Sequence, residues 1–216
     1  MKNLRTMICI TLAAVLAVTS LAGAQELKTI NLPEPEKTGG LPFMETLMNR
    51  SSTREYSTEK LPAHELSNIL WAAWGFNRPE KKLRTAPSAS NRQELTVYAI
   101  LEEGVFRYDA EANTLVQTVS GDIRESSGQQ DFVYTAPLNL VFVADLTKMG
   151  GNNLENKIRM ALADTGYISQ NVYLYCASRG LGTVVRGLFD REVLSKAMKL
   201  GPDQYITLTQ TVGYMK

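Results

Sequence analysis

The sequence predicts one domain of the α+β class, and three observations lead to this prediction. A chain of 216 residues has about the length of a single domain. Its hydrophobic fraction of 44% and charged fraction of 21% are those of an ordinary globular protein. Segments with apolar residues at helical spacing alternate with runs of β-branched and aromatic residues.

The charge balance and the rarity of histidine limit the possible functions. Lys and Arg number 23 and Asp and Glu 22, a formal net charge of +1, so no nucleic-acid partner is expected. The single histidine, His64, excludes a multi-histidine metal site, and we interpret it as a surface residue. Cys176 stands in an apolar run, which favours a buried, inert thiol over a nucleophile.

Residues 1–24 are interpreted as a signal peptide. Lys2 and Arg5 give a positive start, residues 7–18 are almost wholly apolar, and Ala22-Gly23-Ala24 is a small-residue cleavage site. The apolar run is shorter than the roughly 20 residues that a membrane span needs. We therefore expect an exported, periplasmic or extracellular protein without a stable membrane span after processing. An uncleaved N-terminal anchor is the alternative.

The first half of the mature chain predicts an arm and two helices. Residues 25–40 contain prolines and glycines without a period and form the N-terminal arm. Apolar residues from Phe43 onward have helical spacing as far as residue 49. A second helix opens at Pro62 and stops at Gly75, because proline suits the first turn and glycine the end of a helix. The polar residues 81–93 are expected to form a loop or the start of a short helix.

The second half of the chain predicts most of the strands. The β-type runs cover residues 95–101, 104–109, 114–118, 138–145 and 204–212. The nearly continuous apolar run at 138–145 is typical of a central strand. Residues 157–174 have helical spacing and many small apolar residues, which predicts a long, buried helix.

The first motif is Arg50-Ser51-Ser52-Thr53-Arg54-Glu55-Tyr56. Two guanidinium groups four residues apart, with hydroxyl groups between them, suit a phosphate and a polar ring edge. Taken alone, arginine and serine in a turn are more typical of a solvated surface.

The second motif is Ala86-Pro87-Ser88-Ala89-Ser90-Asn91-Arg92-Gln93. Asn91 and Gln93 each carry an amide donor and a carbonyl acceptor, a pattern that suits the edge of a flavin ring. The alternative is an ordinary helix cap by Ser88 or Ser90.

The third motif is Gly180-Leu181-Gly182. Two glycines after a long helix bring the backbone close to a ligand or make a sharp turn. A plain helix end is the alternative.

In this order and at these distances, the three motifs resemble those of the nitroreductase superfamily of FMN-dependent oxidoreductases. The matching residues are Arg50, Ser52, Arg54 and Tyr56; Pro87, Ser88, Asn91 and Gln93; and Gly180, Leu181 and Gly182. The resemblance covers about residues 43–216. The spacing is most similar to that of the small branch that includes the oxidases of thiazole- and oxazole-forming peptide systems.

The resemblance implies a nitroreductase-like FMN-binding domain over residues 41–216, an α+β sandwich whose mainly antiparallel sheet is flanked by helices. It also implies a homodimer with FMN at the interface. The first motif would hold the phosphate, ribityl chain and pyrimidine edge, the second would reach the ring from the partner subunit, and the third would lie near flavin N5. The candidate cofactor-binding residues are Arg50, Ser51, Ser52, Arg54, Pro87, Ser88, Ala89, Ser90, Asn91, Gln93, Gly180, Leu181, Gly182 and Lys216.

Two departures from the family pattern concern the phosphate. Ser51 stands where a second arginine is common, and the C-terminal basic residues are reduced to Lys216. Lys216 is a candidate phosphate ligand or a frayed terminal residue. Arg84 is a further candidate cation or a solvated one.

The resemblance places the chemistry on the cofactor and on no protein residue. The implied cycle is ping-pong: NAD(P)H or another donor reduces FMN, and a small electron-poor acceptor then takes the electrons. An exported enzyme lies away from the cytoplasmic nicotinamide pools. It could therefore use another electron donor or act as an oxidase. The alternative is an exported flavin-binding or carrier protein without turnover.

Overall fold

A computed structural model describes residues 27–216, so the signal-peptide prediction concerns residues outside the described part of the chain. The helices are α1 (Phe43–Asn49), α2 (Ala63–Trp74), α3 (Phe132–Thr135), α4 (Leu154–Arg179) and α5 (Arg191–Ala197). The strands are β1 (Thr29–Asn31), β2 (Phe76–Arg78), β3 (Leu83–Arg84), β4 (Leu95–Leu101), β5 (Gly104–Asp109), β6 (Thr114–Ser120), β7 (Leu138–Asp145), β8 (Leu181–Arg186) and β9 (Gln204–Tyr214).

A seven-stranded sheet forms the centre of the molecule, in the order β1-β6-β5-β4-β7-β9-β8. Every pairing within it is antiparallel. Central strand β7 is buried along nearly its whole length, as its continuous apolar sequence requires. The predicted α+β class and antiparallel sheet are confirmed.

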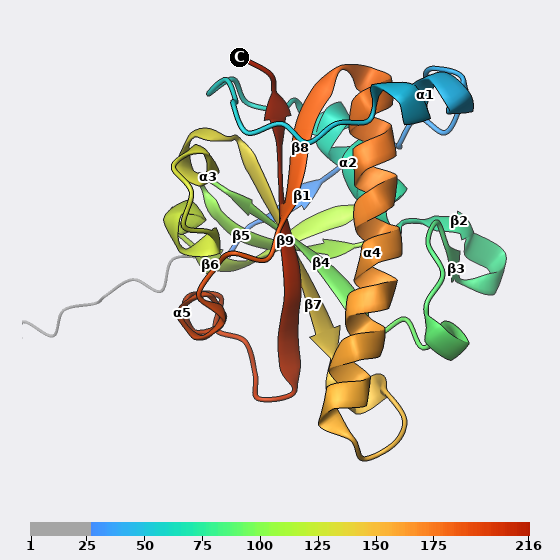
Figure 1. The fold of residues 1–216 in the computed structure, drawn as a ribbon, viewed down its shortest axis with the longest axis vertical. Helices are drawn as coiled ribbons and strands as arrows, with labels where there is room; N and C mark the ends of the chain where they lie inside the picture. Colours follow the sequence, from blue (N-terminus) through green and yellow to red (C-terminus); the bar gives the residue numbers. More distant parts are fainter. Residues whose placement is uncertain (1–26) are drawn as a thin grey trace, which may run out of the picture.

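Helices cover both faces of this sheet, so the domain is a three-layer sandwich (Figure 1). Helices α2 and α4 pack over one face, where Ile69, Phe142 and Ile168 belong to the larger hydrophobic cluster. Helix α5 packs on the other face, and its Leu194 joins Ile206 in a second cluster. The first cluster holds α4 against the sheet, and the second holds α5.

Several short elements escaped prediction because they carry too few residues to show a period. Strand β1 lies in the N-terminal arm and pairs with β6 at the sheet edge. Strands β2 and β3 form a small hairpin at the start of the predicted 81–93 loop. Strand β8 begins directly after α4, where Gly180 takes a left-handed conformation with φ of 70° and ends the helix.

Helix α4 is longer than predicted and is buried on one face only. Ile168, Val172 and Cys176 lie in the core, whereas Met160 and Tyr167 are exposed. Helix α1 packs beside the C-terminal part of α4 and exposes further apolar side chains (Figure 1). Exposed apolar area of this extent is typical of an interface. No helix among residues 27–216 has the length and hydropathy to cross a membrane.

Candidate functional site

Three segments that are distant in sequence meet at the C-terminal end of α4 (Figure 1). The Thr53 amide donates to the Thr183 carbonyl of β8 at 3.0 Å. Tyr56 forms an antiparallel bridge with Met215, the residue before the C-terminal lysine. The first motif, the Gly-Leu-Gly strand and the C-terminus therefore share one place in the fold.

Tyr173 of α4 organises the first motif. Its hydroxyl lies 2.9 Å from Ser52 Oγ and accepts a hydrogen bond from the Val185 amide at 3.0 Å. The Arg50 guanidinium lies over the Tyr173 ring, 5.4 Å from its centroid. Sequence reasoning missed Tyr173, because a tyrosine inside an apolar helix gives no signal of its own.

The cations of this site have no acidic partners in the described part of the chain. The arginine ion pairs of residues 27–216 involve Arg107, Arg124 and Arg179, and neither Arg50 nor Arg54 takes part in one. Arg54 and Lys216 line one shallow hollow of about 620 Å³ together with Tyr56. The structure thus brings Lys216 to the first motif, in a hollow that Glu55 and Asp131 also line.

The two glycines of the third motif have different structural roles. Gly180 ends α4 in the left-handed conformation. At Gly182, a Cβ would lie 3.0 Å from Met215 Cγ and 3.1 Å from Thr53 Cγ2, so a side chain would push these segments apart. Leu181 between them is buried, which fixes the start of β8 against α4.

The second motif forms a loop in an unusual backbone conformation. Ser90, Asn91 and Gln93 have φ values of 54°, 52° and 49°, in the left-handed region that non-glycine residues rarely adopt. Such conformations cost about 1–3 kcal/mol each and persist where surrounding contacts enforce them. Pro87, Ser90 and Asn91 are exposed, and Ser88 and Ala89 are half-buried.

The side chain of Gln93 is half-buried and bonded within the protein, and it contacts the exposed Asn91. Its Oε1 accepts from Arg84 Nε at 2.7 Å, and its Nε2 donates to the Lys82 carbonyl at 2.8 Å and to Asn91 Oδ1 at 3.2 Å. Arg84 lies over the Trp74 and Phe76 rings, and burial lowers its pKa to about 10, so it stays charged at neutral pH. Arg84 is therefore a support of the loop and not a solvated residue, and the Asn91 amide nitrogen has no partner among residues 27–216.

The second motif runs along α4 away from the first. The Asn171 amide donates to the Thr85 carbonyl at 3.2 Å, and further on Asp164 Oδ2 accepts from the Ala89 amide at 2.8 Å. Asp164 is nine residues before Tyr173, which corresponds to about 14 Å along a helix. Within one chain, the outward face of the second motif is thus well removed from Arg50.

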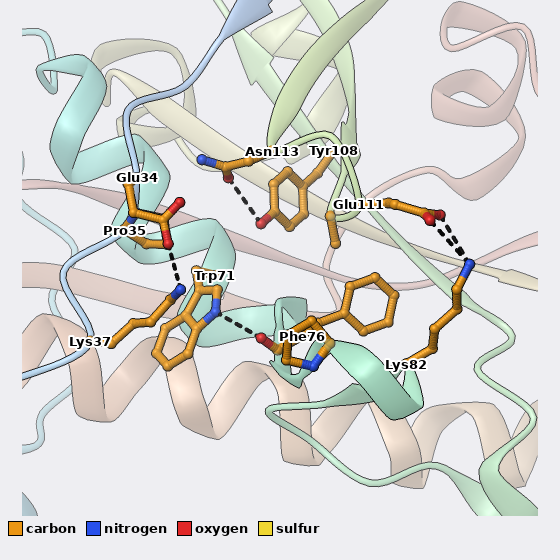
Figure 2. Close-up of a pocket in the computed structure, with 11 residues that line it drawn as sticks. Glu34, Pro35, Lys37, Trp71, Phe76, Lys82, Tyr108, Glu111 and Asn113 are labelled. Atoms are coloured by element: carbon orange, nitrogen blue, oxygen red, sulfur yellow. Dashed lines mark hydrogen bonds and ion pairs between the residues drawn. The ribbon is translucent and has the colours of Figure 1, made fainter.

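A further hollow of about 340 Å³ lies between the arm, α2 and the β5–β6 turn (Figure 2). Its polar side chains pair with one another or with backbone: Tyr108 with Asn113, Lys82 with Glu111, and Trp71 Nε1 with the Phe76 carbonyl. It therefore offers no unpaired group that would select a ligand, and its Lys82 and Phe76 serve to support Gln93 and Arg84.

Two other predictions concern residues outside the site. Cys176 is fully buried, and burial raises the pKa of its thiol, so it is inert as predicted. The His64 side chain is 62% exposed, with Nε2 3.7 Å from Glu65 Oε1, in agreement with a surface histidine.

An antiparallel sandwich with cations gathered at one end of its central helix has the architecture of the nitroreductase-like class of α+β proteins. The family model described as "Nitroreductase family" matches residues 47–214. The chain is 31% identical over 194 residues to the "Putative nitroreductase MJ1384" of Methanocaldococcus jannaschii, which covers 85% of this chain and 95% of that protein. The chain belongs to the nitroreductase family.

Solved structures agree with this assignment. The crystal structure of a "putative nitroreductase" from Ralstonia eutropha JMP134 is 43% identical, with a TM-score of 0.82 over 87% of this chain and 90% of that one. A chain of the E. coli microcin synthetase McbBCD complex, 18% identical, has the same fold, with a TM-score of 0.67 over 94% of this chain and 83% of that one.

Proposed function

We propose that this protein is an FMN-dependent oxidoreductase that transfers electrons from NAD(P)H or another donor to a small electron-poor acceptor in a ping-pong cycle. The observation that carries the proposal is that the first motif meets the C-terminus at the end of α4. Arg50 lies over the Tyr173 ring, Arg54 and Lys216 line one hollow, and none of the three forms an ion pair within residues 27–216. FMN, when bound, supplies the two-electron chemistry. A solved structure of the same fold, 16% identical, is described as a putative NAD(P)H:FMN oxidoreductase.

The residues of the first site fit a phosphorylated, flat ligand. Arg50 and Lys216 would neutralise the phosphate, and Ser52, fixed by Tyr173, would donate to the chain that links phosphate and ring. Arg54 would reach the polar edge of the ring. The motifs provide one phosphate site and no G-x-G-x-x-G fingerprint after a strand, which favours FMN over a dinucleotide.

A homodimer would complete the site. The second motif lies well removed from Arg50 within one chain, and both α1 and α4 expose apolar side chains. In a twofold dimer, each chain would therefore present its Pro87–Gln93 loop to the cations of its partner. The Asn91 amide, oriented by Gln93, would then bond the ring edge.

One experiment separates an enzyme from a flavin carrier. The purified protein should be yellow and release FMN on denaturation. Anaerobic addition of NADH, NADPH or dithionite then reports turnover: an enzyme is bleached within seconds by its donor, and a carrier only by dithionite. A colourless protein that takes up no added FMN would refute the proposal. If the protein is exported, as proposed, it has no access to the cytoplasmic NAD(P)H pool. The same assay therefore also tests electron donors other than NAD(P)H.

We expect Asn91→Ala to change the reduction of bound flavin more than its binding. One neutral hydrogen bond contributes about 0.5–1.5 kcal/mol, so FMN affinity should fall by less than about tenfold. The midpoint potential should shift, because the amide lies at the ring and not at the phosphate. Spectroelectrochemical titration measures this shift, and Asn77→Ala, an exposed asparagine that contacts Arg78, is the control. An unchanged potential in Asn91→Ala would remove Asn91 from the ring.

A further inference from the structure

Glu94, the residue directly after the second motif, is a buried carboxyl group without a donor. Its side chain is 0% exposed. Neither of its side-chain oxygens has a partner of normal hydrogen-bond geometry among residues 27–216, although its own backbone amide lies close enough to favour the ionised form. A buried carboxylate without hydrogen bonds is strongly disfavoured, so the group is stable there only in its protonated form.

The acceptor for that proton is Asp164 of α4. Its carboxyl group is 2% exposed and lies within hydrogen-bonding distance of Glu94. Ionisation of both of two adjacent buried carboxyl groups is unfavourable, and Asp164 accordingly raises the pKa of Glu94. The same Asp164 accepts the Ala89 amide of the loop through Oδ2 at 2.8 Å.

This contact anchors one end of a strained loop. The other end is held by Gln93, whose amide donates to Ser88 Oγ at 2.9 Å and whose side chain is fixed by Arg84. Between the anchors lie Ser90 and Asn91 in the left-handed conformation, which lasts only while both anchors hold.

We propose that Glu94 and Asp164 are positioning residues that share one proton and thereby hold the Ser88–Gln93 loop in its ligand-binding conformation. With the proton, Glu94 donates to Asp164, and Asp164 keeps one charge for the Ala89 amide. Without it, two buried charges face each other, and the pair separates by admitting water and releasing Ala89. The role in FMN binding rests on the proposed function, whereas the anchoring of the loop does not.

The charged groups around the pair define the direction of the pH effect. Lys148 Nζ donates to the Gln93 carbonyl at 3.3 Å, and its charge is the smallest of the effects on the pKa of Glu94, which it lowers. The Arg92 guanidinium lies beside Gly150, and the Asp145 carboxylate bonds Thr147. Burial, with a smaller contribution from Asp164, raises the pKa of Glu94 from 4.5 to about 7, against the opposing effects of its own backbone amide and of Lys148. Protonation of Glu94 thus stabilises the anchored conformation of the loop fully below pH 4.5. This stabilisation falls as the pH rises and is lost once the pH passes about 7.

Hydrogen exchange at the Ala89 amide tests the anchor in the protein without FMN. Glu94→Gln keeps a donor to Asp164 and removes the titration. From about pH 5 to about pH 8, Ala89 protection in the parent should fall at least about tenfold relative to this variant, and then level off. Equal pH dependence in both proteins would overturn the proposal. If the variant does not fold, carboxyl NMR of the parent decides: a Glu94 midpoint above about 6 supports the proposal, and one near the ordinary value of 4.5 overturns it.

FMN titration over the same range separates this inference from the proposed function. The phosphate of FMN itself titrates near pH 6, so the ratio of parent to Glu94→Gln dissociation constants is the quantity to follow. A ratio that rises with pH supports the positioning role. Binding of FMN with a constant ratio overturns that role and leaves the proposed function intact. A pH-dependent Ala89 anchor in a protein that never binds FMN refutes the proposed function alone.

Discussion

Replacing Arg50 by alanine is expected to weaken FMN binding by about ten- to a hundredfold. A charge-assisted hydrogen bond to phosphate contributes about 1.5–3 kcal/mol. Ser51 supplies no second cation, so Arg50 and Lys216 would share the phosphate charge. The contact of Arg50 with the Tyr173 ring restricts the guanidinium before the ligand arrives, so little conformational entropy opposes binding.

A comparison of FMN with riboflavin binding tests whether Arg50 acts on the phosphate. Arg50→Ala should leave the affinity for riboflavin, which lacks the phosphate, nearly unchanged, and flavin-fluorescence titration measures both ligands. Arg107→Ala removes an equal charge from β5 and should change neither affinity, as should His64→Ala. An Arg50→Ala variant that binds FMN like the parent, or that loses riboflavin equally, would place the phosphate elsewhere.

The elements that the sequence predicts well are those with a long, regular pattern. Strands β4, β5 and β7 coincide with their apolar runs because each of these runs is buried and packs within the sheet. Helix α2 begins after Pro62 and ends before Gly75, as proline and glycine dictate. The short strands β1, β2 and β3 have two or three residues each and owe their structure to the neighbouring strand.

The candidate site could be predicted as three motifs but not as an arrangement. That Lys216 lies beside Arg54 depends on the pairing of β9 with β8 and on the Tyr56–Met215 bridge, which no local pattern reveals. Gln93 was expected to face the ligand like Asn91, yet its amide is bonded by Arg84 and Lys82. Side-chain partners of this kind come from the tertiary structure, so spacing alone cannot distinguish a ligand contact from its support.

The exposed face of α4 also differs from the sequence prediction. An apolar helix predicts burial, but its sequence does not show whether the same chain or a second copy buries it. Within one chain, Tyr167 remains 52% exposed although the helix is central to the sandwich. Met160 and the α1 residues Phe43, Met44 and Met48 are exposed as well. Their burial by a second copy would remove this apolar area from water, a favourable contribution of roughly 25 cal/mol per Å².

Tyr167→Glu is therefore expected to convert the proposed dimer into monomers. An unpaired carboxylate buried at an interface costs about 3–5 kcal/mol, and twofold symmetry introduces it twice. The dimer dissociation constant should rise at least about a hundredfold. FMN affinity should fall with it, because each chain would lose the Pro87–Gln93 loop of its partner. Light scattering after gel filtration and FMN titration at the same protein concentration measure both effects.

Val193→Glu is the matched control for this change. Val193 is also 52% exposed, but it lies on α5, in the opposite layer of the sandwich (Figure 1). It should leave both the dimer and FMN binding intact, because the charge stays in water there. A parent protein that is monomeric and binds FMN, or a Tyr167→Glu variant that stays dimeric, would refute the α4 interface. Loss of the dimer with unchanged FMN affinity would show instead that one chain suffices for the site.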